Sequence, residues 1–230
     1  MKIKLSFIVC CALLAGMFSQ AQMQPGTTST SSTGSTSFGI RAGVNFQNLN
    51  GKNSNGDKLE NDLKPGFHVG VNADIPVATD FYIQPGVLFS TKGAKVPSTT
   101  NESKINLSYI EVPVNLLYKP AFGTGRLLLG FGPYVGYAIG GKVKPDNGND
   151  FDIKFQNSVS LAELRTGGYF SRRFDAGANF LAGYEFSSKF SAQLNAQLGL
   201  IKTNPDYESI SNDKTSIKNT GFGLSLGYRL

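Results

Sequence analysis

Apolar residues recur at every second position in eight segments of the chain. Side chains of a β-strand point alternately to the two faces of a sheet, so this period indicates strands with one apolar face. In the first segment Phe38, Ile40 and Val44 share one face, and Arg41 and Asn45 share the other. The eight segments are Phe38–Phe46, Phe67–Ile75, Phe81–Ser90, Ile110–Tyr118, Leu127–Tyr137, Arg173–Phe186, Phe190–Leu200 and Gly221–Leu230.

The composition of the two faces decides between two kinds of barrel. The alternative to a membrane barrel is a soluble barrel of the lipocalin type or a sandwich. Either would expose its charged face to water. Here the apolar face carries no charge, and the other face holds Gly, Ser, Asn and Gln, which suit a narrow lumen. The charged or titratable residues of that inner face are Arg41, His68, Asp74, Glu111, Arg173, Asp175, Glu185 and Arg229. The sequence therefore predicts an all-β fold, an eight-stranded antiparallel transmembrane β-barrel.

Two strands depart from the simple pattern. Leu88 breaks the alternation of the third strand. The early part of the fourth strand, before Ile110, is out of phase with the rest, which predicts a β-bulge there.

The connections fit this topology. Short links at 76–80, 119–125 and 187–189 alternate with long polar ones at 49–63, 93–104, 140–171 and 203–216. Outer-membrane barrels have short periplasmic turns and long extracellular loops. This threading places two aromatic belts on the apolar face. The outer belt is Phe46, Phe67, Phe89, Tyr137, Phe174 and Phe222, and the inner belt is Phe38, Phe81, Tyr118, Tyr184, Phe186, Phe190 and Tyr228.

The first residues have the pattern of a secretory signal peptide. Lys2 and Lys4 precede an apolar run too short to span a bilayer, and small residues end at Ala21, where we expect cleavage. Cys10 and Cys11 raise the alternative of a lipoprotein signal, but they come too early and lack the usual small neighbours. We therefore expect residues 1–21 to be a signal peptide, 22–37 a flexible Ser/Thr-rich linker and 38–230 the outer-membrane barrel.

Removing the signal changes the charge and the cysteine count. The mature chain would hold 20 basic and 16 acidic residues, a net charge of about +4, and no cysteine. Disulfides and thiolate chemistry are thereby excluded. The basic surplus forms no dense run, so we expect no nucleic-acid partner.

Five short segments carry recognisable motifs: FGIRAGVN from Phe38, YIEVPVNLLY from Tyr109, GPYVGY from Gly132, GANFLAGYEF from Gly177 and GLSLGYRL from Gly223. In these segments the chain resembles the PorT-type outer-membrane β-barrel family, the porin-like small barrels of Bacteroidetes. The resemblance covers the chain from about Phe38 to its end. It implies a barrel inserted by the outer-membrane assembly machinery, in a family where few members have an assigned activity and one branch is associated with protein secretion.

Candidate chemistry is sparse. His68 is the only histidine and points inward with Asp74 and Glu111, so a general base is conceivable there. A narrow filled lumen favours a hydrogen-bonded His68 instead. The acidic segment 146–152 has oxygen donors suited to calcium, but its glycine is misplaced for an EF-hand loop. We therefore predict no enzyme, no catalytic, cofactor-binding or metal-binding residues, and no cofactor.

The remaining predictions concern function. Inward Arg41, Arg173 and Arg229 are expected to be neutralised by the four inward acids, which would leave a closed or very narrow lumen. Phe151, Ile153 and Phe155 alternate with polar residues, which predicts a hairpin above the membrane with an apolar stripe. The stripe is either an exposed contact site or a lid over the barrel mouth.

We expect a monomeric structural or interaction barrel, embedded in the lipid bilayer of the outer membrane. Its loop 140–171 would meet a protein or glycan partner. An accessory role in secretion or transport, or a small-solute porin, is the alternative.

Overall fold

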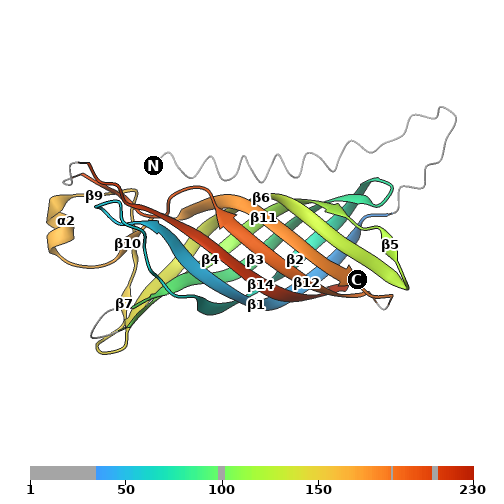
Figure 1. The fold of residues 1–230 in the computed structure, drawn as a ribbon, viewed down its shortest axis with the longest axis horizontal. Coiled ribbons are helices and arrows are strands. Elements are labelled where there is room, and N and C mark those ends of the chain that lie inside the picture. The colour runs from blue at the N-terminus through green and yellow to red at the C-terminus, as the bar shows by residue number, and fades with distance from the viewer. Residues whose placement is uncertain (1–34, 98–101, 188, 209–211) are drawn as a thin grey trace. The chain divides into compact units, whose positions relative to one another are not determined.

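The protein forms a closed barrel of eight antiparallel strands in the computed structural model, which describes residues 35–97, 102–187, 189–208 and 212–230 (Figure 1). The expected signal peptide and most of the expected linker lie outside these residues. The barrel strands are β1 (Ser37–Lys52), β2 (Lys64–Ala78), β3 (Phe81–Val96), β4 (Ser103–Tyr118), β6 (Gly125–Pro145), β11 (Phe174–Glu185), β12 (Phe190–Gly199) and β14 (Ser216–Arg229). The predicted fold class is confirmed.

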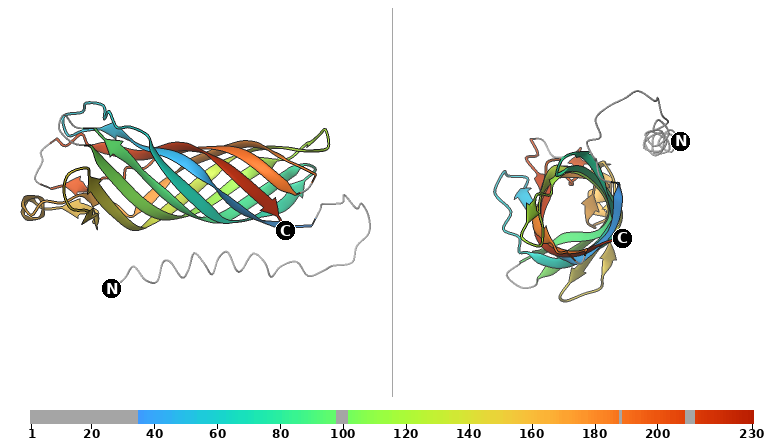
Figure 2. Two further views of the ribbon diagram at one scale, coloured as in Figure 1. Left: turned by 90° about the horizontal axis from the view of Figure 1, so that it is seen from below. Right: turned by 90° about the vertical axis from the view of Figure 1, so that its right-hand side faces the viewer.

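The barrel closes through its first and last strands. β1 pairs with β14 from Gly39 opposite Arg229 to Lys52 opposite Ser216, and the Leu230 amide donates to the Phe38 carbonyl at 2.8 Å. β6 pairs with both β4 and β11, so the sheet has no free edge among its eight barrel strands. Seen along its axis, the barrel is a continuous ring of strands (Figure 2).

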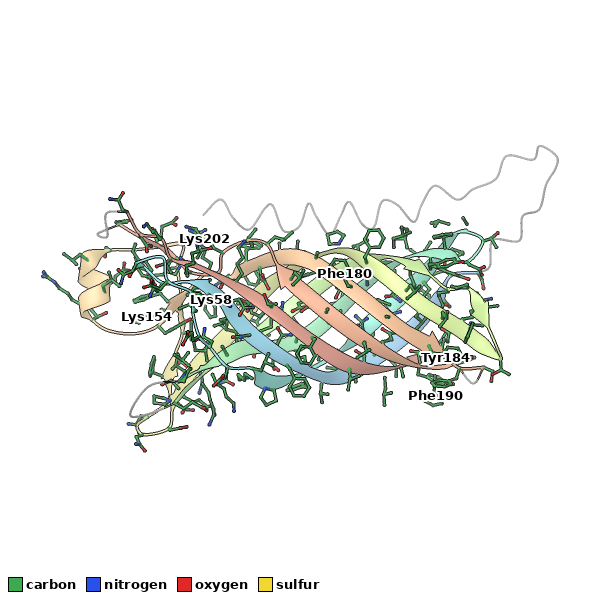
Figure 3. All side chains as sticks on the ribbon, viewed as in Figure 1. Lys58, Lys154, Phe180, Tyr184, Phe190 and Lys202 are labelled. Carbon is green, nitrogen blue, oxygen red and sulfur yellow. The ribbon has the colours of Figure 1, made fainter. Side chains whose placement is uncertain are left out.

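The alternation of side chains follows the sequence pattern. In β4 every second residue from Ile105 to Leu117 is buried, and the residues between them lie outside. The outer surface is apolar: Phe180, Tyr184 and Phe190 all project away from the barrel (Figure 3). Such a surface is unsuited to water and fits the hydrocarbon of a membrane.

The aromatic residues of the two predicted belts contact one another in pairs, five of them across neighbouring strands and one, Tyr184–Phe186, along a single strand segment. Three ring pairs come from the predicted outer belt, and three from the predicted inner belt. Their ring centroids are 4.7–5.7 Å apart, which is the spacing of favourable aromatic contacts. The pairs are Phe46–Phe222, Phe67–Phe89, Tyr137–Phe174, Phe81–Tyr118, Tyr184–Phe186 and Phe190–Tyr228.

The predicted bulge lies on the neighbouring strand. Ser108 pairs with Gly140 and Tyr109 with Ala138, so Ile139 of β6 is the extra residue. The phase of β4 is unbroken: Ile105 and Leu107 point into the barrel like the polar residues further along. The sequence pattern indicated a change of phase in the early part of this strand because the residues that face inward there are apolar as well.

Close packing of the strands explains part of the glycine content. A Cβ added to Gly43 would lie 2.0 Å from the Leu224 carbonyl oxygen and 2.7 Å from the His68 ring. The His68 ring lies against Gly43, and only glycine leaves room for it there.

Small elements gather at the end with the long loops. They are β7 (Phe151–Asp152), β8 (Lys154–Phe155), β9 (Ser158–Val159), α2 (Leu161–Arg165), β10 (Phe170–Ser171) and β13 (Asp206–Tyr207); β5 (Ala121–Phe122) lies at the other end (Figure 1). Lys58, Lys154 and Lys202 mark the long-loop end in Figure 3. No helix among the described residues is long and apolar enough to cross a bilayer.

Candidate functional site

The lumen is filled by its own side chains, and its paired charged residues form two groups. The lower group lies near the short turns. The Lys119 ammonium nitrogen contacts Asp74 at 2.8 Å and Glu185 at 2.9 Å, and Arg229 reaches the second Glu185 oxygen at 3.3 Å. Gln84 donates to the other Asp74 oxygen at 2.8 Å. Two cations thus face two acids, as a buried ionic group requires.

A chain of amides rises from this group towards the middle of the lumen. Asn179 donates to Asn115 at 2.9 Å, and Asn115 donates to Gln84 at 3.3 Å. These side chains come from β11, β4 and β3, so the chain of amides joins three strands of the wall. Each amide can donate and accept, which suits a buried polar network.

The upper charged group is centred on Lys92, whose side chain has 0% exposure. Its ammonium nitrogen lies 2.8 Å from Glu111 and 2.9 Å from Asp175, and 4.4 Å from the Tyr134 ring centre. Tyr134 and Asn219 donate to the same Asp175 oxygen at 3.2 and 2.9 Å. Salt bridge and cation–π contact together surround the buried charge.

Above the Lys92 group the interior becomes apolar. We call this cluster the apolar plug; its buried members are Leu49, Ala94, Ile105, Leu107, Tyr109, Ala138, Val143 and Ile153. Ile153 belongs to the long loop after β6, and only 5% of its surface is exposed. Its amide donates to the Gly141 carbonyl at 3.0 Å, which fixes the loop against the barrel wall.

The plug decides between the two interpretations of the apolar stripe. Ile153 is buried and Phe155 packs against the plug, so this part of the stripe is a lid over the barrel mouth. The predicted hairpin forms differently from the expectation: β6 pairs with β7, and β11 begins only at Phe174. Phe151 alone of the three stripe residues remains largely exposed.

The predicted charge pairing is correct for Arg229 only. Arg173 points to the long-loop end, where it donates to the Ala138 carbonyl at 3.0 Å and lies 4.6 Å from the Phe155 ring centre. Arg41 contacts no carboxylate within 4.0 Å among the residues that the structure describes. Lys92 and Lys119 take the places expected for these arginines.

His68 has no acid as a hydrogen-bond partner in the described lumen. Its Nε2 atom lies 2.7 Å from the Ser225 hydroxyl oxygen, which also accepts from Asn195 at 2.6 Å. The Ser225 hydroxyl can donate to Nε2 or accept from it, because an oxygen that already accepts from Asn195 keeps a second lone pair. The two candidate partners are engaged elsewhere, Asp74 by Lys119 and Glu111 by Lys92.

Small cavities remain between the lumen side chains that the structure describes, and two of them are lined by Arg41. The upper cavity, about 40 Å³, is lined by Arg41, His68, Ser90, Glu111, Asn195 and other polar residues. The lower cavity, about 30 Å³, is lined by the Lys119 group and by Arg41. A water needs roughly 10–15 Å³ by this measure, so each cavity has room for a few water-sized particles and none for an organic substrate.

The aspartates of segment 146–152, considered above as calcium ligands, each pair with a different lysine. Asp146 contacts Lys104 at 3.2 Å, Asp150 contacts Lys144 at 3.3 Å and Asp152 contacts Lys142 at 4.0 Å. Across the described residues, no three acidic, histidine or cysteine side chains are grouped as metal ligands would be. Each of these carboxylates therefore has a lysine as its counter-charge.

The remaining loop structure is held by polar contacts. Asp206 accepts from both Lys202 and Arg172 at 2.6 Å, and the hydrogen bond from Lys202 lowers the pKa of Asp206. Ser160 and Glu163 form a capping box around α2. Hydrogen bonds from the Ser160 backbone and side chain lower the pKa of Glu163.

A closed antiparallel barrel with an apolar outer face, paired aromatic residues and a filled polar lumen is an integral outer-membrane barrel. Residues 18–204 match the model of the family described as outer membrane protein beta-barrel domain, and the chain belongs to this family. The protein is therefore located in the outer membrane, with its barrel in the lipid bilayer. The search of curated proteins found no match.

Solved structures with a similar fold include three outer-membrane proteins. Ail of Yersinia pestis, solved with the heparin analogue sucrose octasulfate, is 15% identical, with 86% of this chain and 100% of that chain covered and a TM-score of 0.40. A major outer membrane protein of Thermus thermophilus is 14% identical (86% and 100% covered, TM-score 0.45). OprG of Pseudomonas aeruginosa is 12% identical (84% and 95% covered, TM-score 0.40).

Proposed function

We propose that the protein is a non-enzymatic interaction barrel that binds a protein partner through its long loop 140–171. The supporting observation is the division of this loop into two parts. The first part, around Ile153, closes the barrel. The second part, from Ser158 to Thr166, contains helix α2, which has no buried residue. A helix that adds nothing to the core is available for contacts with another molecule.

The second part of the loop is held in place at its start and at the helix. β9 pairs with β13, and the Asp206 amide donates to the Asn157 carbonyl at 2.9 Å. On the other side, Gln156 donates to Glu163 at 2.9 Å. A surface fixed in this way loses little conformational entropy on binding, which favours recognition.

The chemistry of α2 favours a protein as the partner. Leu161 is 48% exposed on this helix, and Arg165 is exposed one turn later. An exposed leucine beside an arginine resembles the centre and rim of a protein interface more than a sugar-binding surface. By the rule that long loops lie outside the cell, this surface faces the exterior.

The lumen supports the non-enzymatic part of the proposal. The cavities are too small for an organic substrate, and His68 contacts Ser225 instead of an acid. The proposal includes membership of the PorT-type branch, supported by the segments quoted above, and export with cleavage after Ala21.

The test uses full-length protein in the native membrane with a photo-crosslinking residue at position 161. We expect a discrete protein adduct at position 161 and none at Lys58, an exposed residue of another long loop. The adduct should disappear when residues 160–167 are replaced by a Gly/Ser linker, while secretion is unchanged. A glycan adduct, or failed secretion with the adduct retained, would contradict the proposal.

A further inference from the structure

Arg41 stands between the two cavities of the lumen. Among the described lining residues, it is the one that borders both the upper and the lower cavity. Its side chain comes from β1 and is only 7% exposed. A guanidinium stays protonated at any physiological pH, so a full positive charge is buried at this point.

This charge lacks the partners that the other lumen cations have. Lys92, Lys119 and Arg229 each contact a carboxylate at 2.8–3.3 Å. Arg41 has one long hydrogen bond, from Nη1 to Gln193 Oε1 at 3.5 Å, and its buried Nε atom has no acceptor. A buried charge is normally paired or fully hydrogen-bonded, so Arg41 has donors left for a ligand.

Glu111, which also borders the upper cavity, attracts Arg41 through space but makes no hydrogen bond or ion pair with it. One of its oxygens contacts Lys92 at 2.8 Å, and the other accepts from Gln197 at 2.8 Å. Ser90 is a further donor at the upper cavity, because its oxygen accepts from Asn45 and its own hydrogen is left for another partner.

The size of the upper cavity restricts the ligand. At roughly 10–15 Å³ for each water-sized particle, 40 Å³ accommodates about three or four of them. A halide fits together with a water, whereas an organic acid does not. The water has partners too, since Asn45 Oδ1 and Gln47 Oε1 border this cavity and lack donors.

We propose that the lumen binds a halide-sized monovalent anion, chloride under cellular conditions, at the Arg41 guanidinium. The anion accepts hydrogen bonds from Arg41 and Ser90, and a neighbouring water donates to Asn45 and Gln47. The site is independent of the partner bound by the loops. The competing arrangement is a pair of waters that link Arg41 to Glu111 without an ion.

Bromide tests the site directly. Crystals of the full-length protein grown in sodium bromide should give an anomalous peak within hydrogen-bond distance of Arg41. Water at that position and no anomalous peak would overturn the proposal.

A solution experiment gives an independent measurement. At equal ionic strength, chloride or bromide should raise the unfolding temperature relative to gluconate, which is too large for the cavity. Arg41→Gln should lose this difference, with halide affinity lowered at least tenfold. Arg229→Gln, which removes the same charge from a paired site, should keep it. A halide effect retained in Arg41→Gln would also overturn the proposal.

Discussion

The Lys92 ammonium nitrogen and an Asp175 carboxylate oxygen lie 2.9 Å apart at a point of the lumen where neither side chain has any exposed surface. The same nitrogen contacts Glu111 on the other side. One cation thus holds two acids from two other strands, β4 and β11, and joins three parts of the wall.

Removal of the cation should be costly. Lys92→Met leaves Glu111 and Asp175 buried without their partner, and we expect a loss of about 3–5 kcal/mol in the free energy of unfolding. Denaturant titration of the refolded barrel in detergent measures it. The triple variant Lys92→Met/Glu111→Gln/Asp175→Asn should recover most of the loss. Lys58→Met, at an exposed site, should change it by less than about 0.5 kcal/mol. A similar small effect for Lys92→Met would contradict the assignment.

The lid should detach without destroying the barrel. Ile153→Asp places a charge inside the apolar plug, so we expect the loop to leave the barrel mouth. Trypsin cleavage after Lys154 should accelerate at least tenfold, while the barrel itself still resists dissociation in SDS at room temperature. Phe151→Asp, at the exposed stripe position, is the matched control. Equal cleavage rates in the two variants would argue against the lid.

The lumen should conduct poorly even when the lid is open. The Lys92 group, the amide chain and the Lys119 group lie in series below the plug, and the remaining cavities are about 40 and 30 Å³. We expect no steady conductance of porin size from the wild-type protein or from Ile153→Asp in planar bilayers. A stable nanosiemens channel from the wild type would favour the small-solute porin instead.

The order of the long loops should depend on pH. The pKa of Glu163 and that of Asp206 are lowered, so both carboxylates stabilise the folded loop above their ordinary pKa values. That contribution is lost as the pH falls through the lowered values. The protection of residues 157–166 against hydrogen exchange, taken relative to the intrinsic rate at each pH, should therefore fall below about pH 4. The double variant Glu163→Gln/Asp206→Asn should lack this acid-dependent change. An unchanged profile in that variant would show that other groups are responsible.

The sequence could predict which residues of each strand face the lumen, because in a membrane barrel one face of every strand has to be apolar. In β6, Leu128 and Tyr134 are buried, and Leu129 and Phe131 are exposed, as the alternation indicated. All four are apolar or aromatic, so composition could not separate them. Their positions in the two-residue repeat of the strand separate them, because a shift by one residue would exchange the two faces.

The lumen contacts could not be predicted in the same way. Lys92 lies two residues after Ser90 and therefore points to the same face. The sequence pattern ends the third strand at Ser90, whereas β3 continues to Val96. Lys119 was assigned to a short link although it is next in phase after Leu117. If the alternation is continued beyond the predicted end of each strand, it places both lysines on the lumen face. Which acid each one contacts depends on the stagger of strands far apart in sequence, for which the pattern holds no information.

The pairing of β1 with β14 sets a condition on how the barrel is made. The two strands that complete the ring are the first and the last of the eight, so the wall cannot close until almost the whole chain is present. Until then, two unpaired strand edges and an apolar surface stay open to self-association. The pairing of these two ends is therefore the last step of assembly, and it removes both open edges at once.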